Sequence, residues 1–229
     1  MSTPRPRPVV ALDGPAGAGK STISRMVAER LGFVLVDTGA LYRGVALLAK
    51  ERTIDWSDES SLAQMCRDTK FHFEPGEGGR SRLFIDGKDR SAHIRSETIS
   101  QGASKVSRHP TVRAALLDMQ RNLGKDGGVV MEGRDIGTVV FPDAEVKVFL
   151  TAAPEVRARR RVAELNAMGQ QVDFEDILDS IKDRDRRDSA RSVAPLVQAR
   201  DAVTVDTSDL GIDQAVDCVV DLVRSRFPE

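Results

Sequence analysis

Residues 9–22 read VVALDGPAGAGKST and begin with a short run of apolar, mostly β-branched residues. The apolar run at 9–12 is typical of a buried strand, and the Gly-Pro pair that follows it indicates a turn. From residue 20 to residue 31 apolar residues return at helical spacing, and Gly32 marks the end of that helix. The stretch therefore predicts a strand, a glycine-rich loop and a helix in immediate succession.

The loop inside this stretch matches the pattern G-x-x-x-x-G-K-[ST] over residues 14–21. Glycines let backbone N–H groups turn toward phosphate oxygens, and the following helix adds its free N–H groups. In this pattern Lys20 reaches the β- and γ-phosphates, and the Ser21 hydroxyl is a ligand for Mg²⁺. The loop alone leaves open whether the chain is a small kinase, a switch GTPase or a motor. The residues expected to bind a nucleoside triphosphate are Gly14, Pro15, Ala16, Gly17, Ala18, Gly19, Lys20, Ser21 and Thr22.

Further along the chain, short apolar segments alternate with helical patterns. The remaining expected strands cover residues 33–36, 129–131, 146–150 and 203–205. The remaining expected helices cover residues 41–48, 58–67, 96–108, 111–123, 154–168, 174–190 and 212–223. Because continuously apolar strands that alternate with helices are typical of covered parallel sheets, we predict an α/β fold with five parallel strands flanked by helices. No repeat or linker divides the chain, so residues 1–229 are expected to form one domain.

Residues 70–93 break this alternation. The segments KFHFEP and SRLFIDGKDR alternate apolar and polar residues, and Gly-Glu-Gly-Gly at 76–79 separates them. Asp86-Gly87 is a strong signal for a tight hairpin turn. We therefore expect a small antiparallel sheet within an insert at about residues 59–107. The core around the insert would consist of about residues 8–58, 108–156 and 200–229.

The composition excludes several classes of function. The chain carries 34 Lys and Arg against 35 Asp and Glu, whereas proteins that bind nucleic-acid polymers or anionic membranes usually carry a positive excess. Aromatic residues make up 4%, which argues against a platform that stacks single-stranded bases. No apolar run is long enough to span a membrane, and the first residues, MSTPRPRP, lack the apolar core of a signal peptide. We expect a cytoplasmic monomer, with disorder over residues 1–8.

The cysteines and histidines indicate no metal site. Cys66 and Cys218 are far apart and fit two free, buried thiols in a reducing cytosol. The three histidines form no cluster with the spacing of zinc ligands. Arginine is abundant, with 26 residues against 8 lysines, and codon bias in a GC-rich genome could also produce this ratio. Only the placement of the arginines can therefore decide their meaning.

Two polar segments directly follow predicted strands, where the carboxyl ends of a parallel sheet meet its ligands. The first is DTGALYR at 37–43, and the second is EGRD at 132–135. Thr38 and Arg43 in the first, and the acid and arginine of the second, are candidates for the crevice beside the phosphate loop. The alternatives are a helix N-cap at the start of the first segment and a structural ion pair in the second.

A third polar segment covers residues 184–191 and reads RDRRDSAR. Arg184, Asp188 and Arg191 share one face if the segment is helical. Two guanidinium groups with a carboxylate between them suit a sugar phosphate. The alternative is a solvated helix face with salt bridges.

A second arginine cluster lies one helix earlier, at Arg157, Arg160 and Arg161. A polar loop at 167–174, which contains a glycine, joins the two helices. Phosphoryl transfer needs positioning, charge neutralisation and exclusion of water, and a closing helical pair with arginine on both arms supplies all three. We therefore expect a lid at about residues 157–192, with a solvated helix face as the alternative.

Four segments, in this order and at this spacing, resemble the bacterial-type cytidylate kinases. They are GPAGAGKST at 14–22, DTGALYRG at 37–44, EGRDIGTVVFPDA at 132–144 and IKDRDRRDSARSVAPL at 181–196. The resemblance covers nearly the whole chain, and residues 70–93 are similar to the enlarged nucleotide-binding insert of that family. It implies a P-loop kinase fold with five parallel strands. It also implies the reaction of ATP with CMP or dCMP, with Mg²⁺, to give ADP and CDP or dCDP.

The resemblance further implies a role for each matching position. Arg43, Arg134 and Arg191 would hold the CMP phosphate, and Arg184 and Asp188 would contact the ribose. Ser104, Arg113 and Asp135 would read the cytosine edge, with Thr38 and Tyr42 lining the site. Arg157, Arg160 and Arg161 would close on the ATP phosphates. Glu132 stands where relatives have Asp and Ser21 where some have Gly, so a role for Ser21 toward Mg²⁺ is not universal in the family.

Two other classes of protein are weighed against this one. A related kinase would phosphorylate another nucleotide or a metabolite such as shikimate, but the insert and residues 184–191 favour a nucleotide acceptor. A GTPase needs an N-K-x-D motif and a nucleic-acid-remodelling ATPase is expected to have a basic excess, and the sequence has neither. The balanced net charge therefore conceals an expected local excess of arginine around one phosphate loop.

Overall fold

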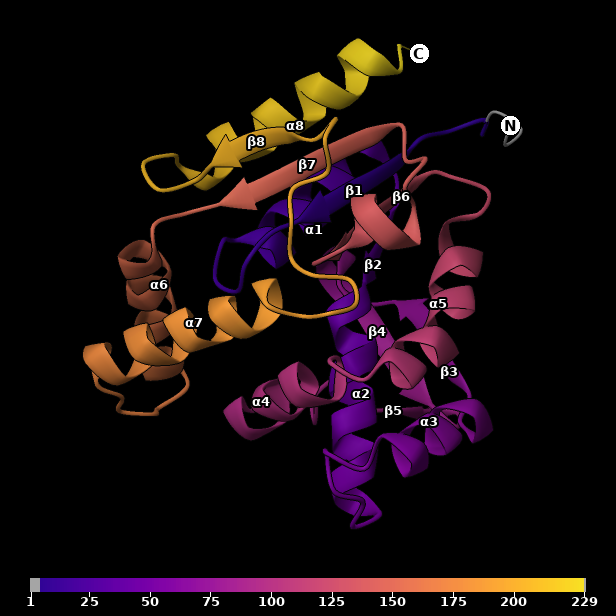
Figure 1. Cartoon of the computed structure of the whole chain (residues 1–229). Coiled ribbons are helices and arrows are strands. Elements are labelled where there is room, and N and C mark those ends of the chain that lie inside the picture. The colour runs from indigo at the N-terminus through magenta and orange to yellow at the C-terminus, as the bar shows by residue number, and fades with distance from the viewer. Residues whose placement is uncertain (1–4, 229) are drawn as a thin grey trace.

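A computed structural model describes residues 5–228 and has a parallel sheet at its centre (Figure 1). The sheet has the strand order β2-β6-β1-β7-β8, and its neighbouring strands are parallel throughout. The bounds are Val9–Asp13 (β1), Val34–Asp37 (β2), Val129–Gly133 (β6), Val146–Thr151 (β7) and Val203–Asp206 (β8). The expected five-stranded parallel sheet is confirmed.

Helices cover both faces of this sheet (Figure 1). They are α1 (Lys20–Leu31), α2 (Thr38–Glu51), α3 (Glu59–Asp68), α4 (Glu97–Val106), α5 (Pro110–Gly124), α6 (Pro154–Ala167), α7 (Phe174–Ser189) and α8 (Ile212–Arg226). The central strand β1 shows why two layers are needed, since all its residues are buried. Val10 and Leu12 belong to the core shared with α1 and α8, whereas Val9 and Ala11 belong to the opposite core, against which α5 packs.

Within the expected insert at residues 59–107, three strands form an antiparallel sheet in the order β3-β4-β5. Its strands are β3 (Phe71–Pro75), β4 (Ser81–Ile85) and β5 (Lys88–Asp89). Leu83 and Ile85 pack on α2, where a Cβ at Gly44 would lie 2.9 and 3.1 Å from their side chains. Both α2 and the insert belong to one apolar cluster, which also includes α3, α4 and α5. The insert is therefore fixed to the helix that begins at the end of β2.

The segment before β1 is ordered by its arginines. Arg5 donates to Asp143 at 2.7 Å and to Glu145 at 2.9 Å. Arg7 donates to the Gly32 carbonyl at 2.9 Å, beyond the end of α1. The expected disorder is therefore wrong for residues 5–8, because each guanidinium reaches fixed acceptors of the core. Residues 1–4 lie outside the described part of the chain.

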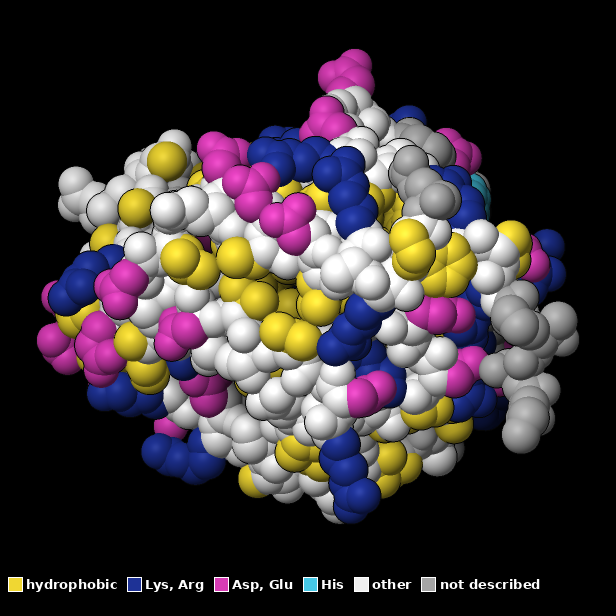
Figure 2. All heavy atoms as spheres, turned by 90° about the horizontal axis from the view of Figure 1, so that it is seen from above, with side chains coloured by type: hydrophobic (Ala, Val, Ile, Leu, Met, Phe, Trp, Pro, Cys, Tyr) yellow, Lys and Arg dark blue, Asp and Glu magenta, His cyan; other side chains and the backbone are white. Residues whose placement is uncertain are grey.

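Charges of both signs share the molecular surface. In the space-filling view from above, Lys and Arg side chains lie beside Asp and Glu side chains rather than in one basic field (Figure 2). Between α1 and α8, for example, Arg30 pairs with Asp213 and Asp217. Among residues 5–228, no helix combines the length and apolar character that a membrane span needs.

The two cysteines differ in exposure. Cys66 on α3 is buried and free, whereas Cys218 on α8 is free and exposed. The expectation of two buried thiols is therefore wrong for Cys218. Its neighbours in sequence Val216, Val219 and Val220 occupy the buried face of α8, so Cys218 points outward.

We predict that only one thiol of the native protein reacts with a disulfide reagent at pH 8. Burial raises the pKa of the Cys66 thiol to about 12, so very little reactive thiolate forms there below that pH. A titration with Ellman's reagent is expected to give one thiol in buffer and two in denaturant. Retention of the native titre in Cys66→Ser, and its loss in Cys218→Ser, would identify the reacting residue. A native titre of two would contradict the prediction.

Candidate active site

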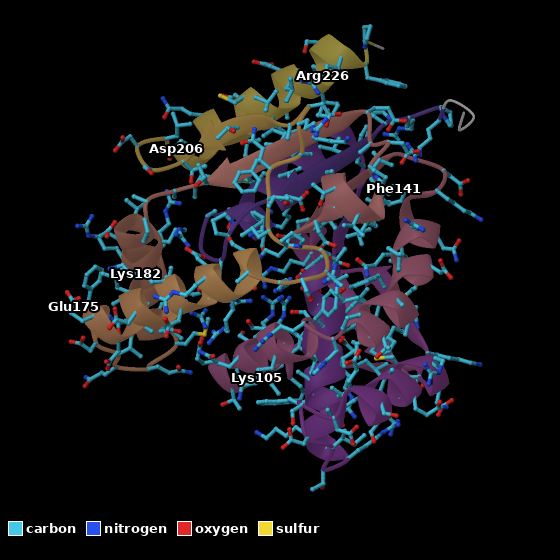
Figure 3. All side chains as sticks on the ribbon, viewed as in Figure 1. Lys105, Phe141, Glu175, Lys182, Asp206 and Arg226 are labelled. Atoms are coloured by element: carbon cyan, nitrogen blue, oxygen red, sulfur yellow. The ribbon has the colours of Figure 1, made fainter. Side chains whose placement is uncertain are left out.

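A cavity of about 710 Å³ opens at the carboxyl ends of β1, β2 and β6. Its wall comes from the phosphate loop, the start of α2, α4, the loop after β6, the α6–α7 hairpin and the segment after β8. In Figure 3 the labels Lys105, Lys182 and Asp206 locate α4, α7 and the end of β8, although these three side chains do not themselves line the cavity. Segments far apart in the sequence thus surround one space.

The phosphate loop has a backbone that requires glycine. Gly14 has φ 149°, and a Cβ there would lie 2.0 Å from the Leu150 carbonyl oxygen. Gly19 has φ 85°, and α1 begins at the next residue. The free N–H groups of the first helical turn therefore open from the loop, as anion binding requires.

Lys20 is buried within this loop. Its Nζ donates to the Pro15 carbonyl at 2.6 Å. Burial, followed by the nearby charges of Arg134 and Arg184, lowers its pKa well below the ordinary value. Glu132 and Asp13 act in the opposite direction. The charged form of Lys20 is therefore disfavoured, and the negative charge of a phosphate would stabilise it.

Ser21 and Glu132 meet at the edge of the cavity. The Ser21 hydroxyl donates to Glu132 Oε2 at 3.0 Å, and Glu132 Oε1 is buried with no hydrogen-bond partner among the described residues. Burial, and then the charge of Asp37, raises the pKa of Glu132 to about 7. No group of three or more His, Cys, Asp or Glu residues within 5–228 could enclose a metal. A hydroxyl and one unpartnered carboxylate oxygen fit Mg²⁺, which keeps waters and substrate phosphates as its other ligands.

A polar pair forms one end of the cavity. Arg113 and Asp135 are both buried and make a salt bridge. The Arg113 guanidinium lies 5.5 Å from the centre of the Tyr42 ring. The Tyr42 hydroxyl and Ser104 Oγ are buried without hydrogen-bond partners in the described chain. This end therefore offers donors and acceptors of fixed direction, which suits the edge of a heterocyclic base.

Arginines and carboxylates alternate between this end and the phosphate loop. Asp188 on α7 is 1% exposed and accepts from Arg134 Nε at 3.0 Å and from Arg191. Burial acts to raise the pKa of Asp188, but the neighbouring arginines outweigh it and hold that pKa below its ordinary value. Arg184 beside them has its pKa lowered to about 10, first by burial and then by Arg134. The cluster is therefore a concentrated cationic field with an ionised carboxylate inside it.

Asp37 and Thr38 hold the start of α2 against the cavity. Asp37 Oδ1 accepts from the Ala40 N–H at 3.1 Å, and Asp37 Oδ2 accepts from Arg43 at 2.6 Å. Thr38 Oγ1 donates to the Glu132 carbonyl at 2.8 Å. Asp37 thus forms the helix N-cap that was the alternative interpretation of this segment. The same carboxylate also orients Arg43. The cap also explains why α2 begins before residue 41.

The three arginines expected on the donor phosphates have different positions. Arg160 donates to the Thr207 carbonyl at 2.6 Å, and Arg161 donates to Glu97 at 2.6 Å, and both line the cavity. Arg157 is instead buried behind the phosphate loop, where it donates to the Ala16 carbonyl at 3.1 Å. It also makes two bonds to Asp185, at 3.1 and 2.6 Å. Arg157 thus ties the loop to the α6–α7 hairpin.

The sequence patterns did not predict several residues of the site. Glu97, Arg187 and Thr207 line the cavity, and Asp13 and Asp185 support it from behind. Arg187 belongs to the arginine run already noted, and Asp13 directly precedes the glycine-rich loop, so both had a local signal. Glu97 and Thr207 had none, because their place in the site follows only from the packing of distant segments.

We predict that Asp185→Ala lowers the free energy of unfolding by about 3 kcal/mol, because it leaves Arg157 buried without a counter-charge. The matched control is Asp183→Ala on the same helix. Asp183 pairs with Arg186 at 3.2 Å, and both side chains are more than half exposed, so we expect a loss below about 0.5 kcal/mol. Urea denaturation followed by circular dichroism measures both. Equal losses would show that the Arg157–Asp185 pair carries no special weight.

Comparison with known proteins assigns the chain to a family. The family model described as cytidylate kinase matches residues 10–225. A cytidylate kinase of Pelotomaculum thermopropionicum is 47% identical over 213 residues, which are 93% of this chain and 94% of that protein. One of Citrifermentans bemidjiense is 46% identical over 221 residues, covering 96% of this chain and 94% of the relative.

Solved structures agree at the level of the fold. A shikimate kinase from Acinetobacter baumannii, in complex with shikimate, has a TM-score of 0.50 and covers 98% of this chain and 97% of its own. The two are 16% identical, so this likeness concerns the fold alone. The family match spans nearly the whole sequence and includes the phosphate loop and the polar residues that line the cavity. The chain therefore belongs to the cytidylate kinase family.

Proposed function

We propose that this chain transfers the γ-phosphoryl group of ATP to CMP and dCMP, giving ADP and CDP or dCDP. The observation that carries the proposal is the Arg113–Asp135 pair, which lies in the same cavity as the phosphate loop. A base-reading pair and a phosphate cradle in one cavity suit a nucleotide acceptor. A small sugar or shikimate would leave the buried donors and acceptors at the base-reading end unsatisfied.

The donor side would be the phosphate loop together with Lys20. Backbone N–H groups of the loop and of α1 would bind the ATP phosphates, with Lys20 on the β- and γ-phosphates. Arg160 and Arg161 line the same cavity and would add positive charge when the α6–α7 hairpin closes. Arg157 would act indirectly, through its bond to the Ala16 carbonyl. We therefore assign Arg157 a positioning role.

Ser21 and Glu132 would hold Mg²⁺. A hydroxyl and a carboxylate oxygen are the hard ligands that this cation prefers, and Glu132 Oε1 is unpartnered within the described chain. When bound, Mg²⁺ neutralises charge on the phosphates. Ser21 and Glu132 already lie 3.0 Å apart through their hydrogen bond, so the two ligands need little reorganisation.

The acceptor side would divide between phosphate, sugar and base. Arg43, Arg134 and Arg191 would bind the CMP phosphate, Arg184 and Asp188 the ribose, and Ser104, Arg113 and Asp135 the cytosine edge, with Thr38 and Tyr42 in the wall. Cytosine presents an amino group where uracil presents a carbonyl. The Asp135 carboxylate accepts a hydrogen bond from the amino group and repels a carbonyl oxygen. A buried polar pair of this kind supports strong discrimination between the two bases.

The reaction would need no general base. The acceptor oxygen belongs to a phosphate that is already an anion at neutral pH. The task of the protein is then to bring two polyanions together, to neutralise charge that develops between them and to exclude water. The buried arginine cluster and Lys20 are suited to this task, since they are held in place before any substrate arrives. We therefore propose direct in-line transfer between the two bound nucleotides.

A coupled assay of ADP release, run with CMP, dCMP, UMP and AMP in turn, tests the proposed function. We expect CMP and dCMP to be the preferred acceptors. Lys20→Ala is expected to reduce turnover by about a hundredfold or more while it leaves the unfolding transition in place. A folded Lys20→Ala protein with near-normal turnover would refute the mechanism, and a preference for AMP or UMP would refute the acceptor.

We predict that Asp135→Ala and Asp135→Asn both lower the preference for CMP over UMP by roughly tenfold or more. Alanine removes the acceptor for the cytosine amino group. Asparagine supplies an N–H group that can donate a hydrogen bond to a uracil carbonyl. The KM for ATP is expected to change little, because the Asp135 carboxylate pairs with Arg113 and not with a residue of the phosphate loop. Steady-state kinetics with both acceptors measures the ratio of kcat/KM values. Equal losses for CMP and UMP would contradict the assignment.

A further inference from the structure

Asp13 is a buried carboxylate at the end of β1, directly before the phosphate loop. Its Oδ1 accepts a hydrogen bond from the Ile136 N–H, and its Oδ2 accepts one from the Gly137 N–H, each at 2.8 Å. It is 5% exposed and lies behind the cavity wall. The two N–H groups open a short helical turn over Ile136–Val140. Asp13 therefore caps a helical turn that belongs to another part of the chain.

The residue that would ordinarily cap this turn is Asp135, which stands at the N-cap position. Aspartate is among the most favoured residues there, because its carboxylate can accept from the first free N–H groups. Within the described chain, however, Asp135 makes no such capping bond, and its carboxylate is paired with Arg113. Asp13 thus satisfies the N–H groups that Asp135 leaves free. Because Asp13 caps the turn in place of Asp135, Asp135 can face the acceptor end of the cavity.

The pairing of β1 with β6 brings Asp13 to this place. Across the two strands Asp13 is opposite Gly133, the last residue of β6, and the loop that follows carries Arg134 and Asp135. A Cβ at 137 would lie 3.1 Å from the Lys147 side chain and 3.4 Å from Asp13 Oδ2, so a larger residue there would crowd Lys147 and come into contact with the Asp13 carboxylate. The contact therefore depends on the register of β1 with β6, and Gly137 leaves room beside the Asp13 carboxylate.

A buried carboxylate is costly to keep. Burial raises the pKa of Asp13 to about 6, although the two backbone hydrogen bonds and nearby Lys20 act in the opposite direction. An uncharged apolar residue at the end of β1 would avoid that cost but would leave two buried N–H groups without partners. The carboxylate is thus suited to fixing this loop, because it accepts both bonds at once.

We propose that Asp13 is a positioning residue for acceptor recognition, since it caps the 136–140 turn and thereby fixes Arg134 and Asp135 in the acceptor site. The proposal rests on the proposed function and deepens it. Asp13 itself touches no substrate in this arrangement. Its effect reaches the acceptor through the loop, and Arg134 extends that effect to Asp188 on α7. Asp13 also directly precedes Gly14, so the kinetic test must separate effects on the two substrates.

The first test is Asp13→Asn, which keeps the shape of the side chain. The amide oxygen can accept one backbone N–H, but the amide nitrogen then faces the other N–H as a second donor. We expect the KM for CMP to rise roughly tenfold and the CMP-over-UMP ratio of kcat/KM values to fall, while the KM for ATP stays within about twofold. An equal rise for ATP, or lower stability with an unchanged acceptor ratio, would overturn the proposal.

A second variant disturbs the same contact from the other side. Gly137→Ala places a Cβ 3.4 Å from Asp13 Oδ2 and 3.1 Å from the Lys147 side chain, and we expect it to shift the acceptor ratio in the same direction but by less than Asp13→Asn. The control is Ser24→Ala on α1, which removes a buried hydroxyl that donates to the Lys20 carbonyl at 2.6 Å. We expect this control to leave the acceptor ratio unchanged. A shift in Ser24→Ala as large as in Gly137→Ala would show that the ratio responds to any buried change and would overturn the proposal.

Amide hydrogen exchange separates this proposal from the proposed function. In Asp13→Asn the amides of Ile136 and Gly137 are expected to exchange at least about tenfold faster, with smaller changes at residues 14–20. Unchanged protection at 136 and 137 would overturn the capping role whatever the enzyme phosphorylates. A wild-type protein that fails to use CMP would refute the proposed function, while the exchange measurement would still decide whether Asp13 caps the turn.

Discussion

The pairing of β1 with β6 is the constraint on which the site depends. It sets Asp13 opposite Gly133, so the phosphate loop and the loop that carries Arg134 and Asp135 leave the sheet side by side. Both strands are buried along their whole length, and parallel strands end at the same edge. A slip of one residue would exchange the side chains that face the two cores, so that Val9 and Ala11 would take the places of Val10 and Leu12. The register that packs the core therefore also sets the spacing between the two loops.

Carboxylates make the arginine cluster possible. Burial lowers the pKa of both Arg184 and Arg191, and the neighbouring charge of Arg134 lowers each of them further. Asp188 lies among them, and Asp37 holds Arg43 nearby. The cavity is therefore organised before substrates bind, because carboxylates rather than solvent lie between the guanidinium groups. This local arrangement is invisible in a net charge of −1, although it is what two phosphate-bearing substrates need.

The fold was predictable from local patterns, because a strand, a turn and an amphipathic helix each leave a periodic signal in the sequence. The candidate residues at strand ends were predictable for the same reason, since parallel topology brings those ends together. Ion pairs between residues that are far apart in the sequence were not predictable. Arg157 and Asp185 gave no pairwise signal, and neither did Arg161 and Glu97, which join α6 to α4. The same limit explains Arg5, whose acceptors lie about 140 residues away.

The helix α7 connects the two halves of the site. Asp185 binds Arg157, which donates to the phosphate loop at Ala16, and Asp188 binds Arg134 and Arg191. The two acids are three residues apart and so lie on neighbouring positions of one helix face. Because a helix moves as a rigid element, a shift of α7 cannot alter the acceptor cluster without also pulling on the phosphate loop. A movement of α7 would therefore act on the phosphate loop and on the arginine cluster together.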